Sequence, residues 1–111
     1  MIRRTFLTIA FLAMASSAAS AQCDPRFSIV NATDTPAREI YIDSSALPAY
    51  TVDRLGSNVL APGQAFNVTP SEGGLYDIKV VMMNNQSAEL RQVNVCQVSR
   101  VTVTPSGLQA Q

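Results

Sequence analysis

"LYDIKVVMMNNQSAELRQVNVC", residues 75–96, is the stretch that decides the fold. Apolar and polar residues alternate along both of its arms, and two asparagines lie between the arms. Alternation with period two is typical of a half-buried strand. Asparagine tolerates the positive φ that tight turns require. We therefore predict an antiparallel hairpin of residues 75–83 and 88–96 that turns at residues 84–86.

The register of this hairpin is less regular than its turn. The first arm has its apolar residues mainly at even positions, whereas the second arm carries both Leu90 and Val93. An unbroken strand cannot send these two side chains to the same face, so either both faces are covered or a bulge lies near residues 91–92. Val81 adds an apolar group on the odd face of the first arm. We therefore predict covered faces, with Val81 and Val93 buried and no bulge.

Four further segments show the same alternation, and they are residues 26–33, 38–44, 64–69 and 99–104. Proline, glycine and asparagine separate them, and no window keeps the spacing of a helix. The chain is therefore predicted to be all-β, a small antiparallel sandwich or barrel-like sheet of about six strands.

Residues 1–21 have the composition of an export signal. Two arginines precede an apolar run, and Ala19-Ser20-Ala21 fits the A-x-A cleavage pattern. The sequence predicts a cleavable signal peptide (1–21) and a single β domain (22–111) that is periplasmic or secreted and not inserted in the membrane. The arginine pair followed by Phe-Leu partly resembles a twin-arginine signal, which leaves the export route open.

Charge and composition exclude several function classes. Without residues 1–21 the chain has six basic and eight acidic residues, too few positive charges to hold nucleic acid. The chain contains no histidine, the usual general base and transition-metal ligand. We therefore expect no catalytic residues, no cofactor, no metal site and no enzymatic activity.

The connection of residues 45–63 is unusually long, and such loops are either functional or packed down by their own apolar residues. We predict an ordered cover in which Tyr50, Leu55 and Leu60 lie against the sheet, with a mobile binding segment as the alternative. Tyr41 lies between two acidic residues and suits a sugar or a cationic ligand, although a solvated sheet face has the same pattern. The predicted binding surface consists of Tyr41, Tyr50, Asp53 and Arg54.

Several short motifs carry a resemblance that covers most of the chain after residue 21. They are "FSIVNAT", "YTVDRLGSNVLAPGQ", "YDIKVV" and "VNVC". The chain resembles small uncharacterised exported (periplasmic) proteins of alphaproteobacteria, often labelled hypothetical or twin-arginine signal proteins. Cys96 matches the closing cysteine of that family, whereas Gly74 stands where the family has its first cysteine. The family has no assigned activity, so the resemblance implies fold and compartment alone.

Cys23 and Cys96 are the two cysteines of the chain. Cysteines of an exported domain normally pair, so we predict a disulfide between them. The function predicted is that of a non-catalytic binding or accessory module of the cell envelope, with another envelope protein as a partner. The alternatives are a small redox or enzymatic protein that uses Cys96, or a weak copper-binding protein that uses Cys96 with Met82 and Met83.

Overall fold

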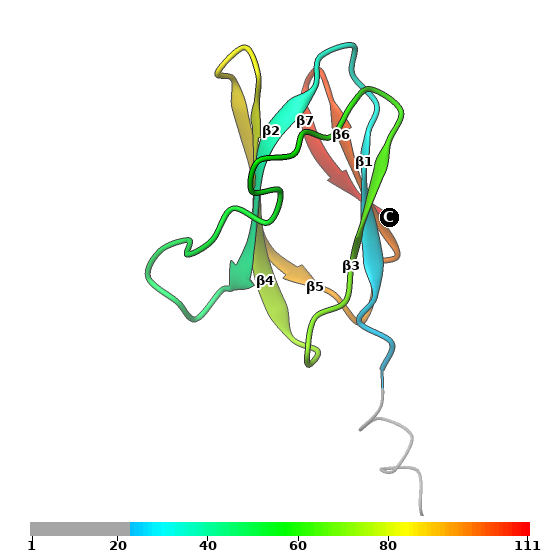
Figure 1. Cartoon of the computed structure of the whole chain (residues 1–111). Helices are drawn as coiled ribbons and strands as arrows, with labels where there is room; N and C mark the ends of the chain where they lie inside the picture. Colours follow the sequence, from blue (N-terminus) through cyan, green and yellow to red (C-terminus); the bar gives the residue numbers. More distant parts are fainter. Residues whose placement is uncertain (1–22) are drawn as a thin grey trace, which may run out of the picture.

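Seven strands form two sheets packed face to face in the computed structural model, which describes residues 23–111 (Figure 1). The strands are β1 (Phe27–Asn31), β2 (Ala37–Ser44), β3 (Ala65–Val68), β4 (Leu75–Met82), β5 (Ser87–Asn94), β6 (Arg100–Thr104) and β7 (Gly107–Ala110). One sheet has the order β3-β1-β6-β7 and the other the order β2-β4-β5. The all-β prediction is confirmed, and the predicted signal peptide lies outside the described residues.

The alternation of the sequence places one apolar face of each sheet between the two sheets. Ile40 and Ile42 of β2 and Ile78 and Val80 of β4 are buried completely or almost completely. From the other sheet, Ile29 and Val101 are fully buried against them. Burial of this kind is the main favourable term in folding, at about 25 cal/mol for each Å² of apolar surface.

The predicted β4–β5 hairpin is confirmed, but its predicted register is wrong. Asn85 adopts φ 71° in the turn, and Val81 and Val93 are both buried as expected. The pairing of β4 with β5 nevertheless shifts between Tyr76 and Ile78. Two residues of β5, 91 and 92, therefore face one residue of β4, which is a β-bulge. The hairpin has both a bulge and covered faces, where the sequence prediction chose one of the two.

Two further features correct the predicted antiparallel sheet of about six strands. β1 pairs with β6 in parallel, because a strand far from β6 in the sequence can enter the sheet in either direction. β7 is a seventh strand in "GLQA", a segment without the β-branched alternation that predicts strands. It forms because a turn at residues 105–106, followed by Gly107 with φ 134°, brings the chain back along β6.

The second half of the long connection, residues 53–60, is bonded to the free edge of β2, and we call it the clamp. The backbones of Leu60 and Ala37 exchange two hydrogen bonds of 2.9 Å. The Asp53 carboxylate accepts from the Ile40 N–H at 3.0 Å, and the Arg54 N–H donates to the Ile40 carbonyl at 2.7 Å. An uncovered strand edge invites pairing with another chain, so the clamp closes this edge of the sheet. Leu60 is buried as predicted.

The predicted disulfide is present between Cys23 and Cys96, whose Cα atoms lie 5.4 Å apart. It joins the segment before β1 to the segment after β5 across 73 positions of sequence. Gly73 lies against the bridge so closely that a Cβ there would stand 2.5 Å from the Cys96 sulfur. The bond therefore fixes the beginning of the described chain to the three-stranded sheet.

Candidate binding site

The outer face of the β2-β4-β5 sheet carries a row of aromatic and charged side chains beneath one loop residue. The register places Tyr41, Lys79 and Glu89 side by side on three strands. Tyr50, from residues 45–52 (the arm), lies against this row. Its ring centre is 5.7 Å from that of Tyr41 and 6.0 Å from the Lys79 ammonium, and its hydroxyl donates to Glu89 at 2.8 Å.

The next row of the sheet places two carboxylates opposite each other, Asp43 on β2 and Asp77 on β4. Like charges in directly opposed positions destabilise a sheet unless other groups compensate them. Thr51 supplies both its N–H and its hydroxyl to Asp43, at 3.0 and 2.7 Å. The arm is therefore tied to the sheet through Asp43.

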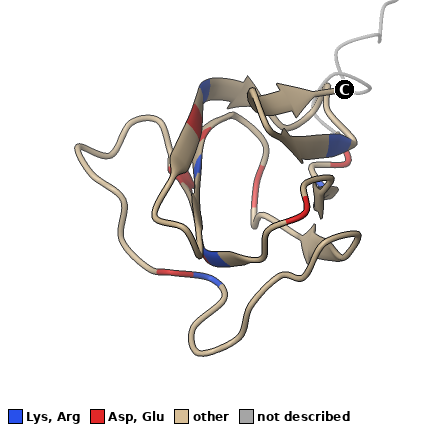
Figure 2. Ribbon diagram, turned by 90° about the horizontal axis from the view of Figure 1, so that it is seen from above, with Lys and Arg blue, Asp and Glu red and all other residues tan. Residues whose placement is uncertain are grey.

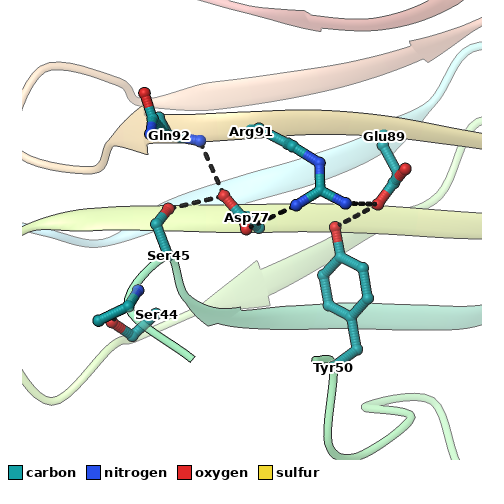
Figure 3. A network of polar contacts seen from close by, with 8 residues as sticks. Ser44, Ser45, Tyr50, Asp77, Glu89, Arg91 and Gln92 are labelled. Carbon is teal, nitrogen blue, oxygen red and sulfur yellow. Dashed lines mark hydrogen bonds and ion pairs between the residues drawn. The ribbon is translucent and has the colours of Figure 1, made fainter. Parts of the chain in front are cut away.

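Asp77 is compensated from both neighbouring segments (Figure 3). Its Oδ1 accepts from the Ser45 hydroxyl at 2.6 Å and from the Gln92 N–H at 2.9 Å. The Arg91 guanidinium lies 3.3 Å from Oδ2 and also donates to Glu89 at 3.1 Å. The bulge at residues 91–92 makes this arrangement, because it turns the Gln92 N–H toward the β4 carboxylate.

These contacts set the charges of the site. Donation from the Ser45 hydroxyl and the Gln92 N–H lowers the pKa of Asp77 below its usual value. The pKa of Tyr50 is raised above its usual value, mainly by partial burial and secondly by the hydrogen bond that its hydroxyl donates to Glu89. At neutral pH the site therefore presents a fixed carboxylate beside a neutral tyrosine.

A hollow of about 150 Å³ opens between the arm and this part of the sheet. Its lining residues are Asp43, Ser44, Leu47, Pro48, Ala49, Tyr50, Asp77 and Arg91. The arm contributes apolar groups, including Leu47, whose exposed fraction is 46%. The sheet contributes two carboxylates and one guanidinium. A side chain with an apolar stem and a positively charged end matches both walls, since long basic side chains bury the stem and pair the head.

The structure brings together two of the four residues in the predicted binding surface. Tyr41 and Tyr50 lie in contact, whereas Asp53 bonds the backbone of β2 and Arg54 donates to the Ile42 carbonyl at 2.6 Å. The sequence prediction did not include Asp77, Glu89, Arg91 or Leu47. The phase change of the apolar pattern near residues 91–92 was the one sequence signal that pointed to this place.

The geometry bears on the two alternatives that depended on cysteine. Cys96 is bonded to Cys23, and residues 23–111 contain no free cysteine. Met82 is buried, whereas its neighbour Met83 is half exposed. Within the described part of the chain, no cluster of three acidic, histidine or cysteine side chains is arranged to hold a metal ion.

Basic and acidic residues are interspersed over the described chain and form no single basic field (Figure 2). No helix long and apolar enough to span a bilayer is present in residues 23–111. Comparisons with protein-family models, curated proteins and solved structures found no match to the chain.

Proposed function

We propose that this protein is an exported, non-catalytic binding module of the cell envelope. Its ligand is a segment of another envelope protein that inserts one basic side chain into the hollow under the arm. The observation that carries this proposal is the opposed pair Asp43 and Asp77, held in the hollow beside the apolar wall of Leu47. Both oxygens of Asp43 and the Oδ2 of Asp77 each accept one hydrogen bond within residues 23–111, so each can accept a further donor from a ligand.

The polar contacts of the site support binding in preference to catalysis. The carboxylates are bonded to Thr51 and Ser45, and the Tyr50 hydroxyl is bonded to Glu89. Groups held in this way are pre-organised for a ligand, because little rotamer freedom remains to be lost on binding. The carboxylate that accepts from the Ser45 hydroxyl, Asp77, has a lowered pKa and is therefore a weak base for activating a nucleophile.

Export is supported by the signal-like composition of residues 1–21 together with the disulfide. Disulfides persist in oxidising compartments and are rare in the bacterial cytosol. We expect the mature protein to begin near residue 22 and to be released from cells with the periplasmic fraction. Cell fractionation followed by N-terminal sequencing checks this, and full-length protein retained in the cytosol would contradict it.

Site-specific photo-crosslinking in living cells tests the binding proposal. A crosslinking amino acid is placed at Leu47, in the hollow, and in a second strain at Val59. Val59 has a similar exposed fraction, 49%, and does not line the hollow, so it is a matched control. We expect one discrete protein adduct at position 47 and none at position 59.

The variant Asp43→Asn connects the adduct to the charge of the hollow. It preserves the size of the side chain and keeps one oxygen for the Thr51 N–H, while its amide NH2 can donate to the Thr51 hydroxyl oxygen. It removes one negative charge opposite a cationic ligand. The adduct at position 47 is expected to weaken at least several-fold. An adduct of unchanged strength, or equal adducts at both positions, would refute recognition through the hollow.

A further inference from the structure

A second cavity, of about 180 Å³, lies at one end of the sandwich, and we call it the end cavity. It lies between the β1–β2, β4–β5 and β6–β7 turns and is open to solvent on one side. Its lining residues are Thr33, Asp34, Thr35, Met82, Asn84, Gln86, Ser87, Ala88, Val103, Thr104, Pro105 and Gly107. The end cavity shares no residue with the hollow under the arm.

The turns around the end cavity are held by polar contacts of their own. The fully buried Asn31 amide donates to the Thr35 and Leu60 carbonyls, at 2.8 and 3.0 Å, and accepts from Thr33. On the opposite side, the Thr104 hydroxyl donates to the Gly107 carbonyl at 2.9 Å. The cavity is therefore shaped before any ligand enters, as is usual for small-molecule sites.

The chemistry of the lining restricts what can enter. Buried or half-buried Met82, Ala88 and Val103 supply apolar surface. Threonine hydroxyls and the amides of Asn84 and Gln86 supply uncharged polar groups, and Asp34 is the single charged residue of the lining. A charged ligand would lose its hydration in this cavity, and the lining has no group of opposite charge to compensate an anion. Only a cation could pair with a charged residue of the lining, Asp34.

The volume also restricts the ligand. An apolar cavity of roughly 150 Å³ in a protein interior accepts one benzene molecule. The end cavity, at about 180 Å³, therefore has room for one six-membered ring or a short branched alkyl group with a polar substituent. Pockets that bury drug-sized ligands are larger, about 300 Å³ or more, so a ligand of that size would not be buried here.

We propose that the end cavity is a binding site for a small uncharged molecule, one ring in size, with its apolar part toward Met82, Ala88 and Val103 and a hydroxyl or amide at the threonine-lined rim. This site is independent of the hollow under the arm and would remain if the partner protein proposed above were not found. The protein would then carry a small-molecule site and a protein-binding site on separate parts of the sandwich.

Titration of the isotope-labelled domain with cyclohexanol, followed by amide NMR, tests the proposal. We expect saturable millimolar binding, with shifts confined to the turns around the end cavity and nuclear Overhauser contacts from the ring to the methyl groups of Met82 and Val103. Cyclohexanecarboxylate, which has the same ring and a negative charge, is expected to bind at least tenfold more weakly because of Asp34 and desolvation.

A cavity-filling variant supplies the second arm of the test. Ala88→Leu places three additional carbon atoms in the end cavity and is expected to weaken cyclohexanol binding at least tenfold. Ala65→Leu, at an exposed position of β3 outside the cavity, is the control and is expected to leave binding unchanged. The nuclear Overhauser contacts are measured on the unaltered protein, so they remain decisive if Ala88→Leu does not fold.

Three outcomes would overturn the proposal. They are non-saturable shifts spread over the surface, equal binding of the alcohol and the carboxylate, and unchanged binding in a folded Ala88→Leu variant. Each of them would show that the end cavity is a gap in packing at the end of the sandwich.

Discussion

The two halves of the connection between β2 and β3 have similar lengths but differ in how they are bonded to the sheet and in how much apolar surface they bury. The clamp, residues 53–60, is bonded to the backbone of β2 and buries Leu55 and Leu60. The arm, residues 45–52, is bonded to the sheet near its two ends, through the Ser45 N–H to the Leu75 carbonyl and through Thr51 to Asp43. Between these ends and next to them it leaves Leu47 and Val52 exposed. One half therefore contributes mainly to stability, whereas the other offers surface to a ligand.

Loss of the disulfide is expected to lower the free energy of unfolding more than any change in the arm or the clamp. A closed loop of 73 positions is worth about 4 kcal/mol in the chain-entropy model. The double variant Cys23→Ser/Cys96→Ser is expected to lose about that much free energy of unfolding, measured by urea titration. By mass spectrometry, unreduced wild-type protein should weigh two hydrogens less than the reduced form. Free thiols at both positions would contradict the disulfide.

Leu55→Ala tests the clamp through its apolar contact. Leu55 is 6% exposed, and removing a buried leucine side chain costs about 2 to 4 kcal/mol. Val52→Ala in the arm is the control, with a change within about 0.5 kcal/mol because Val52 is 60% exposed. Similar losses in the two variants would remove the distinction between arm and clamp.

Asp53→Ala tests the clamp through its polar contact. The substitution leaves the N–H groups of Ile40 and Leu55 without their acceptor, and we expect a loss of about 1 to 2 kcal/mol in thermal or urea unfolding. Asp53→Asn keeps an oxygen in the same place and is expected to recover most of the loss. If Asn were as damaging as Ala, the charge and not the hydrogen bonds would be responsible.

Tyr50→Phe in the arm is expected to have the smallest effect on stability. It removes one partly solvated hydrogen bond to Glu89, so the free energy of unfolding should change by less than about 0.5 kcal/mol. The crosslink at position 47 should nevertheless weaken, because the phenol no longer orients the wall of the hollow. A large loss of stability would place Tyr50 with the clamp.

Most of the fold was predictable because a sheet packed on one face repeats its burial every second residue. Six of the seven strands follow from that repeat, and Leu55 and Leu60 were predicted to pack down because they are apolar residues in a long loop. β7 could not be predicted from its own residues, since its pairing with β6 forms it. The parallel direction of β1 likewise depends on distant parts of the chain.

The site was less predictable because tertiary contacts make it. A tyrosine between two acids identified Tyr41, but the contact with Tyr50 requires the path of the arm. Asp53 and Arg54 have polar side chains of the kind that bind ligands, and only the structure shows that their partners are the backbone of β2. The phase change in β5 was visible in the sequence, although its link to Asp77 was not.

Amide hydrogen exchange at four positions tests the division of the connection most directly. The N–H groups of Arg54 and Leu60 donate to β2, whereas within residues 23–111 those of Tyr50 and Val52 donate to no partner. We predict exchange at Arg54 and Leu60 slower by orders of magnitude, approaching that of the core strands. Equally fast exchange at all four amides would contradict the account.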